Sequence, residues 1–239
     1  MVEPPPPLSE PPAPRHYAVE ASVEAGFAGM GEWNDGLTSL SKASGLPLAK
    51  DNLPAFTSSF EAAILTEVTG RFMLGLQYDR LTGKSEFSVR ELIASGGGVA
   101  EFPTVAEANS NAWLLAARWR VPGGRRGVQP YLQAGAGLGS ARLSFSTSSG
   151  GAHGKGHGFA GSLEAGLHVG EGMVRVRAAA GWRLHRVKLS YNRVQAASQP
   201  GVSRYYFDFD DELRDFATGR ELDLSGAFAR IGVTVVREL

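Results

Sequence analysis

The residues best suited to nucleophilic chemistry are a histidine and a serine in one alternating segment. His185 and Ser190 lie five residues apart, and a serine beside a histidine is a pairing that can activate a nucleophile. Residues five apart in a strand point to opposite faces, and no acidic residue stands beside the pair. We therefore expect no catalytic residues and no enzymatic activity, and keep a lipid-modifying hydrolase at the membrane rim as an alternative.

Two other groups have side chains that can bind metal ions. His153 and His157 share a glycine-rich stretch without a nearby carboxylate or thiolate, which indicates a loop tip more than a transition-metal site. An acidic run has the oxygen ligands that calcium prefers but lacks the glycine and the spacing of a known calcium loop: Asp208, Asp210, Asp211 and Glu212. We expect neither a metal nor a cofactor.

Composition excludes several classes of protein. The 239 residues include no cysteine, so disulfides and thiolate metal sites are ruled out. The formal net charge is zero, which leaves no global basic field to attract nucleic acid. No apolar run approaches the roughly 18 residues that a membrane-spanning helix needs.

Eight segments alternate apolar and polar residues, which is the signature of strands with one apolar and one charged face. The first covers 17–27, with Val19 and Val23 on one face and Glu20 and Glu24 on the other. The others lie within 60–68, 72–79, 113–121, 129–139, 159–169, 174–184 and 222–235. In the last segment Leu222 and Leu224 differ in parity from Ile231, Val233 and Val235, which predicts a bulge near 227–230 or a bend at Gly226.

The gaps between these segments differ in length in a regular way. They are turns of a few residues after the second, fourth and sixth segments. They are long after the first, third and seventh, at 31–57, 82–109 and 192–220, and intermediate at 146–158. Outer-membrane barrels have short periplasmic turns and longer external loops. The pattern predicts an all-β, eight-stranded antiparallel transmembrane up-and-down β-barrel with both termini in the periplasm.

The chain divides into two parts. Residues 1–15 are rich in proline, including Pro4–Pro7, which cannot join a sheet ladder and indicates a periplasmic leader or linker. Residues 16–239 form the predicted barrel. No secretion signal follows Met1, so an outer-membrane location requires that a signal peptide was removed.

Three short sequence segments resemble those of a known group of proteins. They are 130–137 (PYLQAGAG), 158–166 (GFAGSLEAG) and 223–226 (DLSG). They are similar to small bacterial outer-membrane β-barrels, the group that includes the transmembrane domain of outer membrane protein A and the opacity-type porins. The resemblance covers 17–239 and implies the architecture and an outer-membrane location. Members usually end in an aromatic residue, whereas this chain ends in Leu239.

The face opposite the apolar residues carries balanced charge. Six acidic residues and six arginines are expected in the lumen: Glu20, Glu24, Glu61, Glu67, Asp79, Glu164, Arg71, Arg118, Arg120, Arg175, Arg177 and Arg183. Eight strands enclose an interior about wide enough for side chains to fill it. An ion-paired, closed lumen is favoured over an open pore.

Aromatic residues mark the expected borders of the apolar band and two loops. The predicted lipid–water girdles consist of Tyr17, Phe27, Tyr78, Trp113, Trp119 and Trp182. A helically spaced trio could form a lid over the barrel mouth: Trp33, Leu37 and Leu40. A cluster in the last loop has the character of a protein contact surface: Tyr205, Tyr206, Phe207 and Phe209.

The function favoured by these features is that of a structural or interaction component of the cell envelope. It would contact membrane lipid and bind envelope protein partners through its external loops or its proline-rich leader. No nucleic-acid partner is expected. The alternative is a narrow gated channel for small or apolar solutes.

Overall fold

The computed structural model describes residues 16–28, 56–93, 98–147, 150–196 and 221–238. Within them no helix has the length and apolarity to cross a membrane. The leader at 1–15 lies outside the described residues. The strands are β1 (His16–Phe27), β2 (Phe56–Thr69), β3 (Phe72–Ile93), β4 (Gly98–Arg120), β5 (Val128–Thr147), β6 (Gly150–Val169), β7 (Val174–Ala196), β8 (Glu221–Asp223) and β9 (Gly226–Glu238).

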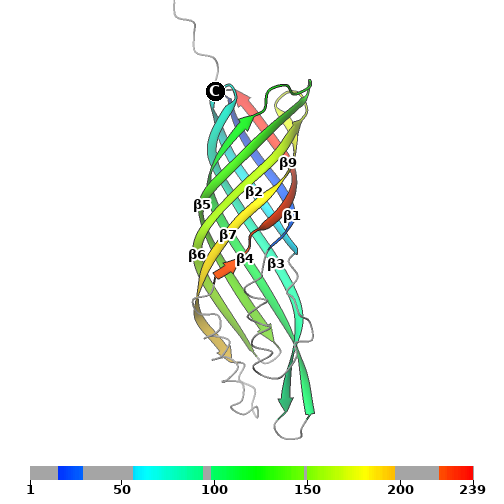
Figure 1. Ribbon diagram of the computed structural model, residues 1–239, viewed down its shortest axis with the longest axis vertical. Helices are drawn as coiled ribbons and strands as arrows, with labels where there is room; N and C mark the ends of the chain where they lie inside the picture. Colours follow the sequence, from blue (N-terminus) through cyan, green and yellow to red (C-terminus); the bar gives the residue numbers. More distant parts are fainter. Residues whose placement is uncertain (1–15, 29–55, 94–97, 148–149, 197–220, 239) are drawn as a thin grey trace, which may run out of the picture.

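The strands form a closed antiparallel ring. Each strand from β1 to β7 pairs with the next in the chain, and β9 pairs with both β7 and β1. The short β8 pairs with β7 beyond the end of β9, so β8 and β9 together occupy the eighth position of the ring. The predicted eight-stranded up-and-down barrel is confirmed (Figure 1).

The last strand corrects the sequence-based expectation of a bulge near 227–230. Its even-numbered residues are inward from Leu222 through Phe228 and Arg230 to Thr234, and Ile231 lies outward. Only the hydrogen-bond ladder is interrupted, at 224–225. Leu222 and Leu224 are therefore lumen residues. The backbone keeps the same alternation throughout, and it is the apolar residues that move from inward positions at 222–224 to outward positions at 231–235.

The two ends of the barrel differ. One end, here called the turn end, carries the start of β1, the end of β9 and the three tight connections, and it lies at the top of Figure 1. Positive φ angles at Gly123 and Gly127 let the chain reverse between β4 and β5, and those at Gly170 and Gly172 let it reverse between β6 and β7. The opposite end, the loop end, carries the other connections. There β3 and β4 form a hairpin that extends beyond the ring (Figure 1), so much of the loop expected at 82–109 is strand.

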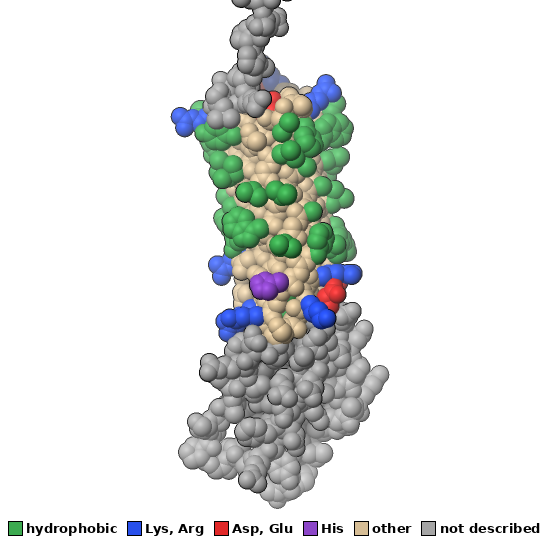
Figure 2. Space-filling view, turned by 90° about the vertical axis from the view of Figure 1, so that its left-hand side faces the viewer, with side chains coloured by type: hydrophobic (Ala, Val, Ile, Leu, Met, Phe, Trp, Pro, Cys, Tyr) green, Lys and Arg blue, Asp and Glu red, His purple; other side chains and the backbone are tan. Residues whose placement is uncertain are grey.

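The outer wall is apolar and the inner wall is largely polar. Leu115 is 73% exposed and Leu138 is 76% exposed, and each of β1–β7 and β9 contributes large exposed apolar side chains. Figure 2 shows these side chains around the middle of the barrel, with charged side chains beyond them at both ends. Glu61, Arg118 and Arg177 are fully buried inside. An apolar exterior around ionised groups is the arrangement of a membrane-spanning barrel, whose wall contacts lipid.

Candidate functional site: the luminal charge network

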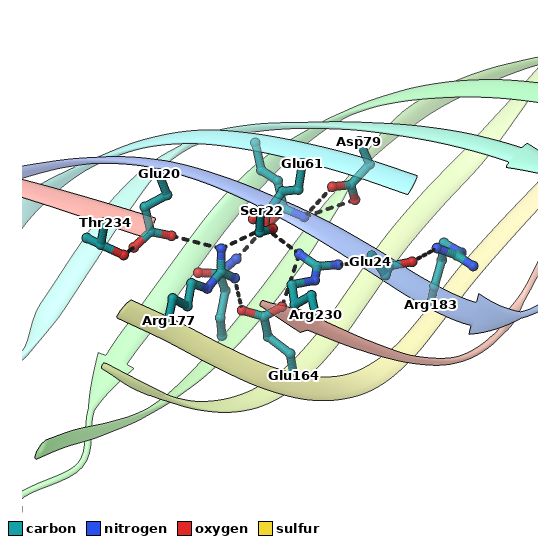
Figure 3. A network of polar contacts seen from close by, with 12 residues as sticks. Glu20, Ser22, Glu24, Glu61, Asp79, Glu164, Arg177, Arg183, Arg230 and Thr234 are labelled. Carbon is teal, nitrogen blue, oxygen red and sulfur yellow. Dashed lines mark hydrogen bonds and ion pairs between the residues drawn. The ribbon is translucent and has the colours of Figure 1, made fainter. Parts of the chain in front are cut away.

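The barrel interior holds ion pairs that tie together strands far apart in the ring. We call eight residues the luminal charge network: Glu20, Glu24, Glu61, Glu164, Arg118, Arg177, Arg183 and Arg230. Figure 3 labels all of them except Arg118. Alternation along each strand directs these side chains inward. Arg118 on β4 binds both carboxylate oxygens of Glu20 on β1, and its Nη2 lies 2.6 Å from Glu20 Oε2.

Arg177 on β7 connects three carboxylates. Its Nη1 lies 2.6 Å from Glu61 Oε2 and 3.0 Å from Glu20 Oε2, and its Nη2 pairs with Glu164. Its Nε donates a 2.6 Å hydrogen bond to the hydroxyl of Tyr131. The guanidinium therefore has partners from β1, β2, β5 and β6, which satisfies a fully buried cation.

Arg230 on β9 is the charged member of the network that sequence reasoning missed. Its Nη2 lies 2.6 Å from Glu24 Oε2, and its Nη1 lies 2.8 Å from Glu61 and 3.2 Å from Glu164. Its guanidinium carbon lies 4.2 Å from the centroid of the Phe228 ring, within range of a cation–π contact. The sequence does contain a signal for it: Ile231 belongs to the outward apolar series, so the preceding residue, Arg230, faces the lumen if no bulge intervenes.

The other predicted network members lie at different positions. Asp79 is half-buried and accepts hydrogen bonds of 2.9 and 3.0 Å from Gln77 Nε2. Arg120 and Glu67 form a separate 3.2 Å pair near the turn end. Arg71 lies exposed in the turn before β3, outside the lumen, where strand alternation does not apply. The side chain of Arg175 bonds to a turn carbonyl, from Nε to Gly172 O at 3.3 Å, rather than entering the network.

Neutral polar and aromatic residues complete the network. Gln133 Oε1 accepts from Arg118 Nε at 2.8 Å, and Gln133 Nε2 donates to Gln77 at 2.7 Å. The Tyr131 ring lies 4.3 Å from the Arg118 guanidinium carbon and stacks on His168 with centroids 4.7 Å apart. These contacts join Asp79, through Gln77, to the ion pairs around Glu20.

Apolar layers lie on both sides of the charged layer. Toward the turn end, a turn-end apolar layer consists of Ala18, Leu65, Met73 and Ala116. Toward the loop end, a loop-end apolar layer of inward, buried side chains consists of Leu81, Leu143, Val187, Leu189, Leu222 and Leu224. The sequence-based expectation of a lumen defined by charge alone missed this layering.

Small residues make room for the large inward side chains. An added Cβ at Gly166 would lie 2.4 Å from the Tyr131 ring, and one at Gly139 would lie 2.3 Å from His185 Nε2. His185 is buried, and its Nε2 lies 2.9 Å from Ser110 Oγ. Glycine on these strands therefore gives the space in which the polar interior packs.

The candidate hydrolase residues are not brought together. His185 faces the lumen, whereas Ser190 is exposed on the outer face and its hydroxyl donates to Lys155 O at 3.2 Å. His157 is exposed on the outer wall. The predicted lid, the acidic run and the predicted partner surface lie outside the described residues: Trp33, Leu37, Leu40, Tyr205, Tyr206, Phe207, Asp208, Phe209, Asp210, Asp211 and Glu212.

The predicted girdle aromatics all lie on outward positions of their strands. Phe27, Trp113 and Trp182 are about 60% exposed toward the loop end, at 63%, 61% and 59%. Tyr78 packs against Trp113 with centroids 4.9 Å apart, and its hydroxyl donates to Asn111 at 2.7 Å. Trp119 and Tyr17 lie toward the turn end.

Comparison with known proteins gave structural likeness only. No family model and no curated protein matches the chain. Ail, the attachment invasion locus protein of Yersinia pestis, crystallised with the heparin analogue sucrose octasulfate, is 8% identical with a TM-score of 0.41, covering 94% of this chain and 99% of that chain. Neisserial surface protein A is 11% identical with a TM-score of 0.41, covering 92% and 96%.

A third solved structure is a major outer membrane protein from Thermus thermophilus. It is 12% identical with a TM-score of 0.44 and covers 93% of this chain and 99% of that chain. Identities and TM-scores this low do not assign an activity. The architecture rests on the ring of strands, the apolar wall and the buried ion pairs, and it is that of a small membrane-spanning β-barrel.

Proposed function

We propose that this chain is a closed, non-enzymatic β-barrel of the bacterial outer membrane that acts as a structural or interaction component of the envelope. The observation that carries the proposal is the set of ion pairs across the lumen. Arg177 on β7 pairs with Glu61 on β2, and Arg118 on β4 pairs with Glu20 on β1. These strands are not neighbours in the ring, so the ties cross the space that a pore would need.

The layers on either side support the same conclusion. A solute entering from the loop end would meet the loop-end apolar layer before the charged layer. Leu143, Leu222 and Leu224 in that layer are almost fully buried. The turn-end apolar layer closes the other side of the network. An interior filled in this way suits a scaffold in which the wall and the loops make the contacts.

The barrel's physics supports the proposed location and orientation. A closed antiparallel ring with an apolar exterior satisfies its backbone hydrogen bonds without an exposed edge, as lipid requires. Short turns on one side and long connections on the other favour a periplasmic turn end and external loops. Both ends of the described ring, His16 and Glu238, then lie on the periplasmic side. Partner contact through 205–209 or through the proline-rich leader is proposed from the sequence.

The test combines conductance with crosslinking. In planar bilayers we expect the purified barrel to give no stable ion conductance, and steady open channels would contradict closure. A photo-crosslinker replacing Tyr206 in intact envelopes should yield a discrete protein adduct. The matched control carries the crosslinker in place of Leu115 on the lipid-facing wall and should yield none. Absence of any adduct from Tyr206 would contradict the role of this loop.

A narrow channel remains a second candidate because some buried polar atoms have no hydrogen-bond partner within the described residues. These atoms are Glu61 Oε1, Ser162 Oγ and Arg230 Nε. Water molecules could satisfy them, and a chain of water is the first requirement of a conduit. Deleting residues 31–55 should raise the conductance if this connection gates such a path, and unchanged conductance would remove gating.

A further inference from the structure

The outer wall carries a cluster of basic side chains just beyond the apolar belt at the loop end. We define the basic patch as Arg142 on β5, Lys155 and His157 on β6, and Lys188 on β7, all of them exposed. Figure 2 shows Lys, Arg and His side chains in this zone, between the hydrophobic belt and the residues drawn in grey, with acidic side chains beside the basic ones at one edge. The luminal network does not involve these side chains.

The strand register places these basic residues directly opposite one another. Arg142 pairs in register with Lys155, and His157 pairs with Lys188. Like charges directly opposite on one face of a sheet are destabilising. Within the described part of the chain, no ion pair joins Arg142, Lys155 or Lys188 to an acidic residue. Arg186, one outward position nearer the belt on β7, lies 3.5 Å from Glu221 and 3.7 Å from Asp223, and Lys188 lies opposite Glu221 in register.

On another part of the wall, basic side chains are compensated or kept apart. At the loop end of β3 and β4, Lys84 pairs in register with the oppositely charged Glu107. Arg80 on the same strand faces Phe60 and Asn111. Positive charge is therefore balanced or isolated on β3 and β4, and Lys188 on β7 lies opposite Glu221. Arg142 and Lys155, by contrast, lie opposite each other with no acidic residue in register beside them. Among the described residues, the pair Arg142 and Lys155 is therefore the place on this wall best suited to bind an anion.

The height of the basic patch above the apolar belt indicates which kind of anion it can reach. His157 lies two residues beyond Phe159, which is 50% exposed on the apolar belt, and Arg142 lies four residues beyond Leu138. At about 3.3 Å per residue and a strand tilt near 45°, these side chains stand roughly 5–10 Å above the edge of the belt. That is the level of the headgroups of a lipid whose acyl chains contact the belt.

We propose that the basic patch binds the phosphate of a phosphate-bearing lipid headgroup in the leaflet on the loop side. Arg142 and Lys155 clamp the phosphate oxygens from two neighbouring strands, as charge-assisted hydrogen bonds allow, and Lys188 and His157 bind the adjacent part of the headgroup. The acyl chains then lie along Leu138, Phe159 and Leu163. The wall thereby holds one class of lipid at one side of the barrel.

The experiment uses spin-labelled lipids with the full chain in phosphatidylcholine vesicles. We expect spin-labelled phosphatidic acid to be enriched over spin-labelled phosphatidylcholine in the motionally restricted layer around the barrel. The double variant Arg142→Gln/Lys155→Gln should reduce this selectivity by roughly 25-fold, because each basic residue near an anionic headgroup contributes about five-fold. The matched control Arg80→Gln/Lys84→Gln removes two charges from the loop end of β3 and should retain the selectivity.

Each other outcome overturns the proposal. Equal loss in both double variants would show general attraction by charge rather than a site. Loss of selectivity on addition of inorganic phosphate would show a free-anion site rather than a lipid site. The proposal rests on the membrane embedding proposed above, and the two fail differently. A chain that does not enter the bilayer restricts neither probe, whereas an embedded chain without this site restricts both probes equally.

Discussion

Arg118 and Glu20, 98 residues apart in sequence, lie inside the barrel as a doubly hydrogen-bonded ion pair between β4 and β1. Both side chains are fully buried. A buried pair is weak evidence of net stabilisation, because removing two charges from water offsets much of their attraction. Its importance lies in what happens when one partner is removed, and this gives the first prediction.

Glu20→Ala should lower the free energy of unfolding by about 3–5 kcal/mol, the usual cost of leaving a buried charge without its partner. Arg118 would lose its carboxylate partner, and Arg177 and Thr234 would each lose a contact. Reversible urea unfolding in lipid vesicles measures the change. Glu171→Ala removes an exposed pair with Arg126 and should change stability by less than about 1 kcal/mol. Equal effects would contradict a buried network.

Leu115→Arg tests whether lipid surrounds the wall. Leu115 is 73% exposed in the middle of the outward face of β4, where an arginine at the bilayer midplane costs about 2–4 kcal/mol. The control Val68→Arg lies on the same face near the turn end and should cost about 1 kcal/mol or less. The measurement is again unfolding in vesicles. A surface in water would tolerate both changes alike, so equal small effects would contradict embedding.

Gly139→Ala should displace the ring of His185. A Cβ at this position would lie 2.3 Å from His185 Nε2, and overpacking of this kind typically costs about 1–3 kcal/mol. The hydrogen bond between His185 and Ser110 should be lost, which a change in the His185 ring resonances in nuclear magnetic resonance spectra would show. Gly70→Ala is the control, because its nearest atom would be 3.9 Å away.

Combining Gly139→Ala with His185→Ala separates a steric cause from a general effect of the substitution. Removing the ring removes the clash, so the double variant should be no less stable than His185→Ala alone. A further loss of stability in the double variant would show that the space between Gly139 and His185 is not what matters at this position.

Ser225→Ala should speed hydrogen exchange at the amide of His185. The strand ladder is interrupted at 224–225, and the Ser225 hydroxyl accepts the His185 N–H at 2.9 Å in place of a ladder bond. A buried N–H without an acceptor costs about 1–3 kcal/mol, so local opening should become easier. Ser190→Ala, whose exposed hydroxyl bonds to a carbonyl at 3.2 Å, should leave that amide unchanged.

Alternation along the strands was enough to predict the fold and most of the luminal charge. The inward parity of Glu20, Glu61, Arg118 and Arg177 follows from one apolar neighbour on each side. Arg230 was missed because Leu222 and Leu224 are inward yet apolar, and this was interpreted as a change of face. Backbone alternation decides whether a side chain points inward or outward, whereas its hydrophobicity reflects what it contacts. In an apolar layer inside the lumen the inward side chains are themselves apolar, so hydrophobicity no longer indicates the face.

The three-dimensional partners could not be predicted from the sequence. Nothing local in the sequence says that Arg177 would meet Tyr131, or that Gly166 would leave room for that ring. Those contacts depend on the strand register and on the curvature of the closed ring. Arg71 was misplaced for the opposite reason, since a residue in a turn has no strand face at all.

The pairing of β1 with β9 has a consequence for how the molecule is made. The ring is completed only when the earliest described strand meets the latest, from His16 opposite Glu238 to Gly26 opposite Phe228. Until then the facing edges of β1 and β9 carry backbone N–H and C=O groups without hydrogen-bond partners, and the hydrocarbon core of a bilayer supplies none. Entry into the bilayer and pairing of β1 with β9 must therefore proceed together, and only after β9 has been synthesised.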